Sequence, residues 1–345
     1  MPTNNRLFYA VYALGVTPFA TPGTYTAVRG LQSVGVNTKF NLDQVFEIGQ
    51  LAIYENVEQL PDVELTVERV LDGYPLFYHL MTKGATAATL IGRSNVRGTV
   101  AMSIYSETVQ NASGLPLTQV VMSGLYVSQL GYNFQVNGPS TEQVTCVGNN
   151  KVWATGAPFV FSGMAAVHGV TSNSPSAASG VNFRQDLVMP SCTFPKEIPG
   201  INGSGKNVDG GTSFPASIQS IKVSANLGRE SMLELGRLAP YFRYVNFPVE
   251  VTCAIEVYCK DGDMVSMTET GYLGNGSNTA DQTIYIQTQE GTKLDLGTKN
   301  RLTNVAFGGA NAGGRGGNAT STYSYVTFND MTVTHPADPT VGLAA

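Results

Sequence analysis

The sequence predicts a mainly β protein built as two tandem β-barrel or β-sandwich domains, each with a short helix and a long loop. One stretch of sequence occurs twice, once in each half of the 345-residue chain. The 38 glycines and 17 prolines, with only 13% charged residues, are typical of short strands joined by many turns. Several segments also alternate apolar and polar residues with the period of two that a half-buried strand requires.

The repeated stretch aligns residues 31–61 with residues 218–248 without a gap. Nine of the 31 aligned positions are identical, whereas chance gives about two at ordinary residue frequencies. In the first copy the identical residues are Gln32, Ser33, Val36, Glu47, Gly49, Leu51, Ala52, Tyr54 and Pro61. Such a long-period repeat indicates a duplicated unit. We therefore place a first domain at residues 1–155, a linker at 156–180 in which residues 171–180 are small and polar, and a second domain at 181–345.

In the first half, strands are predicted where β-branched and aromatic residues are frequent or where polarity alternates. These strands cover residues 7–12, 31–39, 62–68, 99–105, 120–130 and 144–147, with a hairpin turn at Asn137-Gly138. The segment Asp72–Pro75 resembles a helix start, and apolar residues follow at helical spacing, so a short helix is predicted at residues 74–81. Residues 41–60 hold no single period and are interpreted as a long loop between strands.

The second half is predicted to repeat this order of elements. Its strands cover residues 218–226, 247–257, 283–288, 302–307 and 323–328. The long loop recurs at residues 227–246, and a degenerate helix start follows at Asp261. The tail at residues 336–345 is expected to be loose.

Composition excludes several functional classes. The formal net charge of −5 argues against a nucleic-acid grip, because such proteins cluster lysine and arginine against phosphates. No apolar run reaches the ~20 residues of a membrane helix, and the first residues lack the apolar core of a signal peptide. The four cysteines, Cys146, Cys192, Cys253 and Cys259, have no ligand-like spacing, which favours buried thiols in a cytosolic protein. We expect no membrane contact, no metal and no cofactor.

Motifs of catalysis or nucleotide binding are weak. The segment Gly200–Asn207 lacks the Ser or Thr that follows the lysine of a phosphate-binding loop, so we interpret it as a flexible loop. Gly313–Gly317 is a single Arg-Gly unit, and such tracts act through repetition, which favours a hairpin tip. His79, His168 and His335 have no partners at metal-ligand spacing. The sequence therefore predicts a protein that is not an enzyme.

The segments Phe46–Leu51, Ile53–Asn56, Pro61–Glu68 and Leu71–Pro75 carry a family resemblance. They are similar to the tail tube (major tail) proteins of tailed bacteriophages, cyanophages among them, clearly over the first half and more thinly over the second. The resemblance implies, for each domain, a β-barrel-like fold of tail-tube type with one helix and a long stacking loop. Most members of the family have one such domain and form six-membered rings, whereas this chain carries two.

The function implied by the resemblance is that of a structural virion protein, which forms the stacked rings of the tail tube and conducts the genome into the host. Implied partners are further copies of the chain, other tail proteins such as sheath or baseplate components, and phage DNA that passes without specific binding. The implied location is the virion tail, after assembly in the host cytoplasm. A baseplate, neck or hub component of the same fold stays open as an alternative, as does a tandem β-domain adhesin.

Apolar residues of the two long loops would be poorly buried in one subunit, so we expect them to contact neighbouring subunits or rings. The candidate contact residues are Phe46, Leu51, Tyr54, Leu233, Arg237, Tyr241 and Arg243. Alternation places carboxylates opposite the apolar faces of two strands, which makes Glu64, Glu68, Glu250 and Glu256 the candidate lumen-facing residues. Two wall domains per chain predict a trimeric ring with pseudo-sixfold symmetry. The alternative is a six-subunit ring with one domain of each chain outside the wall.

Overall fold

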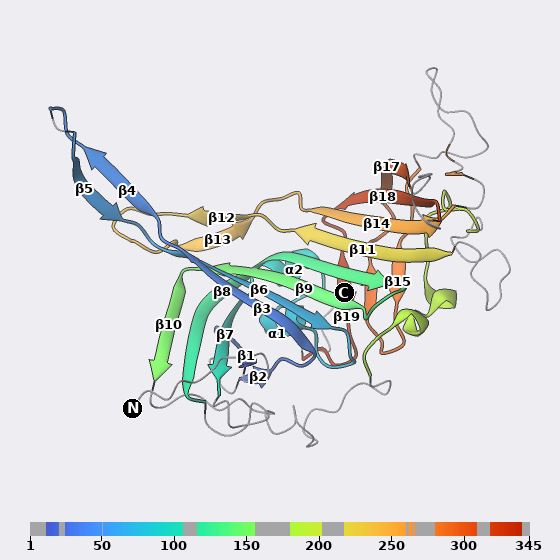
Figure 1. Ribbon diagram of the computed structural model, residues 1–345, viewed down its shortest axis with the longest axis horizontal. Helices are drawn as coiled ribbons and strands as arrows, with labels where there is room; N and C mark the ends of the chain where they lie inside the picture. The colour runs from blue at the N-terminus through green and yellow to red at the C-terminus, as the bar shows by residue number, and fades with distance from the viewer. Residues whose placement is uncertain are drawn as a thin grey trace.

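The computed structural model shows a mainly β chain in which one large sheet runs through both halves (Figure 1). The described residues are 12–20, 25–49, 51–105, 116–155, 180–201, 217–259, 262–263, 265, 280–308 and 318–339. Residues 156–179 of the predicted linker lie outside them, as do residues 7–11 of the first predicted strand and the helix start at Asp261.

Eight antiparallel strands form a continuous path through the large sheet, four from each half. In spatial order they are β3 (Leu31–Lys39), β6 (Asp62–Val70), β9 (Thr141–Gly148), β8 (Thr118–Gln135), β11 (Ile218–Asn226), β14 (Glu250–Tyr258), β18 (Thr320–Phe328) and β17 (Arg301–Gly308). The pairing of β8 with β11 joins the two halves. The predicted mainly β class is confirmed; the sequence predicts two tandem barrels or sandwiches, and in the structure strands of both halves belong to one sheet, because an edge strand of each half pairs with the other half.

Strand β8 organises the first half, since it is long enough to serve two sets of neighbours. Its first part pairs with β7 (Arg97–Ile104) on one side and β10 (Asn150–Thr155) on the other. Its second part pairs with β9 and β11. Beyond β7 the sheet continues through β1 (Tyr12–Pro18) to β2 (Thr26–Ala27).

Both segments that the sequence analysis interprets as long loops are in fact β-hairpins. The first consists of β4 (Leu42–Phe46) and β5 (Ile53–Glu58), and it extends the β3–β6 ribbon far beyond the sheet. The second, shorter hairpin consists of β12 (Arg229–Met232) and β13 (Phe242–Val245). Both project toward the left in Figure 1. The loop interpretation was wrong because every residue of β4 and β5 is exposed and Val245 is the one buried residue of β12 and β13, so little period-two pattern is imposed on either hairpin.

Among the described residues, the α-helices are short and lie in the first half. Helix α1 (Phe77–Met81) is fully buried, and α2 (Leu90–Ser94) follows it. The predicted helix at residues 74–81 therefore exists but begins later. Asp72 does not cap it: its carboxylate binds the Arg69 guanidinium and accepts a hydrogen bond from the Tyr74 amide.

The second half adds a small sheet and two 3-10 turns. The sheet contains β15 (Tyr285–Gln287), β16 (Lys293–Asp295) and β19 (Thr332–Thr334), and the turns are η2 (Arg184–Asp186) and η3 (Met189–Ser191). A β-bridge between Thr89 and Thr332 ties this layer to the first half. The predicted loose tail is wrong at its start, because Asp338 forms an ion pair with the buried Arg93.

One hydrophobic core serves both halves. It includes Val67 and Leu130 from the first half and Ile221, Ile255 and Tyr323 from the second, all nearly inaccessible to solvent. These residues come from the same face of the eight-stranded path, which the helices and the small sheet cover. Burial of a side chain of this size contributes about 1.5–3 kcal/mol, so the shared core and the β8–β11 pairing together bind the halves into one body.

The two four-stranded units have the same topology. Each runs along the chain as a strand, a projecting hairpin, a second strand and then two more strands, and each is ordered first, second, fourth, third in the sheet. Shifts in the pairing register also fall at equivalent places in the two units. The register shifts between Leu31 and Ser33 on β3 and between Ile218 and Ser220 on β11. It shifts again within β8 between Val127 and Gln129, and within β17 between Leu302 and Asn304.

Candidate assembly surfaces

Two strands leave the eight-stranded path open at its ends. Among the described residues, β3 pairs only with β6, and β17 pairs only with β18. Exposed edges are normally protected by proline or charge. Neither β3 nor β17 contains a proline, and their charged residues are confined to one end of each strand, at Lys39 and Arg301. The unpaired main-chain groups of both edges are therefore available to a further strand.

The projecting hairpins carry apolar side chains in water. Ile48, Leu51 and Leu235 are completely exposed, with relative accessibilities of 103%, 105% and 105%. The predicted contact residues Phe46, Tyr54, Leu233 and Tyr241 are more than half exposed, as is Leu238. Large apolar side chains gathered on a projecting element mark an interaction surface. Leu51 is among the predicted contact residues, whereas Ile48 and Leu235 are not, although both lie in the repeated stretch.

The hairpin tips turn through glycines at equivalent places. Gly49 and Gly236 have φ values of +100° and +83°, a region that residues with a Cβ atom rarely adopt. Their identity in the repeat is thus explained by the backbone of the tip.

The two predicted arginines both have partners within the chain. Arg237 forms a 3.1 Å ion pair with Glu234 in its own hairpin tip, where both groups are about half exposed. Arg243 at the hairpin base lies 3.1 Å from an Asp62 carboxylate oxygen and donates to the Asn149 side chain at 2.9 Å. Burial tends to raise the pKa of Asp62, but hydrogen bonds from Asn41 and Arg243 outweigh it and lower that pKa. Arg243 therefore fixes the second hairpin against the base of the first.

A third arginine, which the sequence analysis did not single out, anchors β12. The Arg229 guanidinium donates from Nε to the Val127 carbonyl oxygen at 2.8 Å and from Nη2 to the Ser94 carbonyl oxygen at 2.5 Å. It also stacks 5.1 Å from the centre of the Tyr126 ring. Burial lowers the pKa of Arg229 to about 10, which leaves it charged at neutral pH. Arg229 clamps the second half onto the first beside the β8–β11 pairing.

The face of the sheet opposite the core is polar. On β6, Val63, Leu65 and Val67 are buried, and Glu64 and Glu68 lie on the other side. Glu250 and Glu256 lie on the corresponding side of β14. The predicted acidic set is thus gathered on one face of one sheet, together with many Ser, Thr, Asn and Gln side chains and with Lys222.

Equivalent hydrogen bonds recur on this polar face. The Ser33 hydroxyl donates to Glu68 at 3.4 Å, and the Ser220 hydroxyl donates to Glu256 at 3.0 Å. Both serines directly follow the register shift of their strand. The repeat therefore preserves a side-chain contact as well as a topology.

The strongest buried charges are structural. Arg69 and Glu142 face each other across β6 and β9, and the Glu142 carboxylate accepts from the amides of Phe77 and Tyr78 at 2.8 and 3.2 Å. Burial raises the pKa of Glu142, although Arg69 and these amides oppose the shift. Glu142 thus supplies the hydrogen-bond acceptor for the main-chain amides at the start of α1. The signal was present in the sequence, because both charged residues occupy the core-facing parity of their strands.

The described histidines are buried. His79 donates a hydrogen bond from Nε2 to the Val333 carbonyl oxygen at 3.1 Å, and because a carbonyl oxygen can only accept, Nε2 carries the proton. Burial lowers the pKa of His79 to about 3 and that of His335 to about 4. Both are therefore neutral at pH 7, and the His79–Val333 hydrogen bond joins α1 to β19 of the small sheet. His168 lies outside the described residues.

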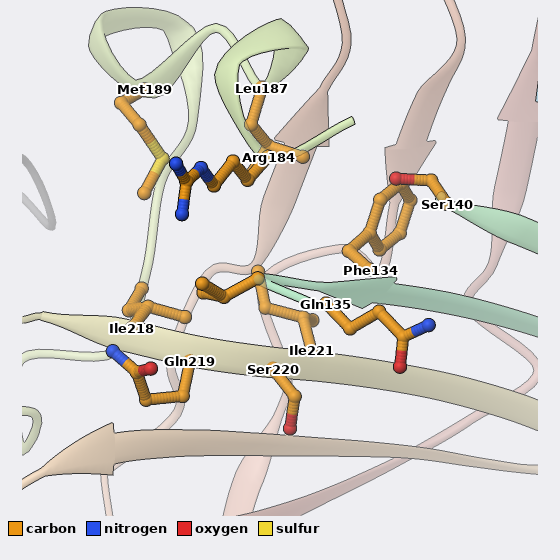
Figure 2. Close-up of a pocket in the computed structure, with 11 residues that line it drawn as sticks. Phe134, Gln135, Ser140, Arg184, Leu187, Met189, Ile218, Gln219, Ser220 and Ile221 are labelled. Atoms are coloured by element: carbon orange, nitrogen blue, oxygen red, sulfur yellow. The ribbon is translucent and has the colours of Figure 1, made fainter. Parts of the chain in front are cut away.

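One apolar cavity of about 180 Å³ lies where the β8–β11 pairing meets the 3-10 turns (Figure 2). Phe134 and Ile221 contribute to its apolar wall, and Met189 and Leu187 cover it from the turns. Arg184 is the one ionisable side chain among its lining residues. Because an acid–base site requires convergent titratable groups, this cavity does not have the make-up of one.

Other candidate motifs give no site in the described part of the chain. Gly203–Asn207 and Gly313–Gly317 lie outside it. Within it, no group of three or more His, Cys, Asp and Glu side chains is arranged to bind a metal ion. None of its helices has the length and apolar character that crossing a bilayer requires.

Comparisons with known proteins give structural similarity at low sequence identity. No protein-family model and no curated protein matches the chain. It is similar to a chain of the anti-feeding prophage baseplate, at 11% identity over 44% of this chain and 98% of the other, with a TM-score of 0.33. It is also similar to the cap that terminates the tube of the anti-feeding prophage, at 12% identity over 45% of this chain and 95% of the other, with a TM-score of 0.34. A third similar chain belongs to the sheath–tube complex of an extracellular contractile injection system in its extended state. The identity is 7% over 44% of this chain and 93% of the other, with a TM-score of 0.32.

Proposed function

We propose that this chain is a structural subunit of a phage tail, without catalytic activity, that assembles into rings which stack into the tail tube. The observation that carries the proposal is the combination of two open sheet edges with two apolar-tipped hairpins. The two open edges lie at opposite ends of the eight-stranded path, which suits lateral, head-to-tail contacts between copies. Such contacts close into a ring when the rotation between copies allows it. Apolar tips that project beyond the sheet suit contacts with the next ring.

The chain acts in this proposal as two copies of one wall unit. The repeated sequence, the shared strand order, the coincident register shifts and the equivalent serine–glutamate hydrogen bonds all support a duplication. A ring of three chains then contains six four-stranded units and has pseudo-sixfold symmetry. Because both hairpins are kept, both units belong in the wall.

The polar face lines the lumen of the ring. It is the face opposite the core, and it bears Glu64, Glu68, Glu250 and Glu256 on neighbouring strands. A wall with acidic and neutral polar groups repels the phosphates of DNA and holds none of them tightly. The genome would pass through it without specific binding.

Electron microscopy of the purified protein tests the assembly role. Wild-type protein should form rings and tubes, whereas Phe46→Asp/Leu233→Asp should remain folded and form no tubes, since both side chains are exposed in the single chain. Ile91→Asp is the matched control, because Ile91 is also exposed but lies on α2. Wild-type protein that stays monomeric at all concentrations would remove the proposal and favour the adhesin alternative.

A second outcome separates the tube from other tail positions. A baseplate, neck or hub component of the same fold would form single rings that do not stack. A difference between the two hairpins supports this alternative role: β12 and β13 have four residues each, whereas β5 has six. Single rings of the wild-type protein, without tubes, would assign the chain to such a position.

A further inference from the structure

We propose that β17 of one copy pairs with β3 of the next in the register that β8 and β11 adopt within the chain. This inference rests on the proposed ring and specifies its contact residue by residue. The partner is a second copy of this chain, and the surface is the pair of open edges already described. Within the chain, the β8–β11 pairing is the direct template for that contact.

The template is well defined. Strands β8 and β11 are antiparallel, with Gly131 opposite Ser224, Tyr132 opposite Val223, and Leu130 opposite Ala225. The pairing closes with a hydrogen bond from the Leu227 amide to the Ser128 carbonyl oxygen at 2.9 Å. It joins the last strand of the first unit to the first strand of the second unit. In a head-to-tail ring, β17 and β3 occupy those same two places.

The equivalence of the strands follows from pairings on their other sides. Ser33 lies opposite Glu68 as Ser220 lies opposite Glu256, which makes β3 the counterpart of β11. For β8 and β17, the residues flanking the register shift, Val127/Gln129 and Leu302/Asn304, occupy the same positions against β9 and β18. Because the register shifts fix both correspondences, neither β3 against β11 nor β17 against β8 can be realigned by one or two residues.

The transferred register places Ala306 opposite Asn37, Phe307 opposite Val36, and Val305 opposite Thr38. Ala306 and Asn37 fall on the polar face, and the other two pairs fall on the core-facing side. A shift by one residue would turn every side chain of the added strand to the wrong face. The faces of the sheet therefore agree across the new contact without further adjustment.

The side chains suit this register. Phe307 against Val36 repeats the aromatic–valine pair of Tyr132 and Val223, and Phe307 is 53% exposed in the single chain. Val305 against Thr38 takes the place of Leu130 against Ala225, which are both buried. An aromatic or β-branched cross-strand pair stabilises a sheet by roughly 0.2–1 kcal/mol. Pairing also covers an apolar ring that is about half exposed in the single chain.

The contact between chains lacks the clamp of the internal one. Arg229, which binds the Val127 and Ser94 carbonyls, aligns with Leu42 in the repeat. Leucine has no donor, so no equivalent hydrogen bonds form beside β3. Rings should therefore come apart between β3 and β17 under conditions in which β8 and β11 stay paired.

Disulfide trapping tests the register. By alternation from the Leu227–Ser128 bond, Ser224 and Gly131 form a non-hydrogen-bonded pair, in which Cα atoms are about 4.5 Å apart. Asn37→Cys/Ala306→Cys, at the matching positions between chains, should oxidise to covalent trimers as the largest species on a non-reducing gel. A Cys259→Ser background removes the described cysteine that is not buried. Both new cysteines replace exposed residues, so the fold is not disturbed.

Matched variants complete the test. Lys39→Cys/Asn304→Cys is in register and should also cross-link, whereas Ser33→Cys/Ala306→Cys is displaced by four residues, about 13 Å, and should not. Rings that form normally but cross-link only in the displaced variant, or in none, would overturn the register and leave the tail role standing. Absence of rings from the wild-type protein would overturn both.

Discussion

The hairpin tips provide the sharpest mutational prediction. Ile48 and Leu235 are fully exposed in the single chain, at 103% and 105%. Replacing both with serine should change the free energy of unfolding by no more than about 0.5 kcal/mol, the usual range for surface positions. The same replacements should abolish or severely weaken stacking, if these side chains are buried between rings.

The size of the effect follows from the number of tips. Each ring of three chains carries six such side chains, and burying one contributes about 1.5–3 kcal/mol. Their loss removes roughly 10 kcal/mol of apolar burial from each junction between rings. Because 1.4 kcal/mol corresponds to a factor of ten, even a fifth of this loss raises the critical concentration for tube growth more than tenfold.

The assay compares tube length and critical concentration by sedimentation and negative-stain microscopy for wild-type protein, Ile48→Ser/Leu235→Ser and the control Ile91→Ser. The double variant should give rings with few or no tubes, and the control should behave as wild type. Tubes of unchanged length and critical concentration in the double variant would refute the assignment of the tips to ring stacking.

Three further predictions concern the clamp, the histidines and the lumen. Arg229→Met should lower the free energy of unfolding by about 3 kcal/mol in denaturant titrations, because hydrogen bonds from a charged group contribute about 1.5–3 kcal/mol each; an unchanged midpoint would contradict the clamp. Burial lowers the pKa values of His79 and His335 to about 3 and 4, so their contribution to stability is present above the unfolded value near 6.5 and is lost as pH falls toward 4. The thermal midpoint should fall over that window and fall less in His79→Gln, whereas equal slopes would exclude His79 as a cause. Glu64→Lys/Glu68→Lys should leave rings intact and make tubes retain DNA at low salt in a filter-binding assay, with the retained DNA protected from nuclease; retained DNA that nuclease digests would place these groups on the outer surface.

Much of the architecture was accessible from the sequence because the repeat and the period-two pattern depend on burial. On β6, the alternation of Val63, Leu65 and Val67 with carboxylates gave the correct faces, and the Asn137-Gly138 turn does join β8 to β9. Strand boundaries were predicted less accurately. The predicted strand ends at residue 130, whereas β8 continues to Gln135, because a period of two does not mark where a strand ends.

The remaining features depend on contacts between distant segments. The hairpins resemble loops in the sequence because their largely exposed strands need no alternation, and main-chain hydrogen bonds, which leave no sequence pattern, pair the strands. The union of the halves through β8 and β11 depends on edge pairing across roughly ninety residues of sequence, for which no local signal exists. Arg229 was overlooked because its acceptors are main-chain carbonyls, whose positions no sequence pattern records.

The number of chains in each ring tests the central claim most directly. A cryo-EM map of rings or tubes, together with native mass spectrometry, gives that number and the position of each half. The duplication predicts three chains per ring, with both halves in the wall and a pseudo-sixfold arrangement of hairpins. Six chains per ring, with only one half of each in the wall, would contradict it.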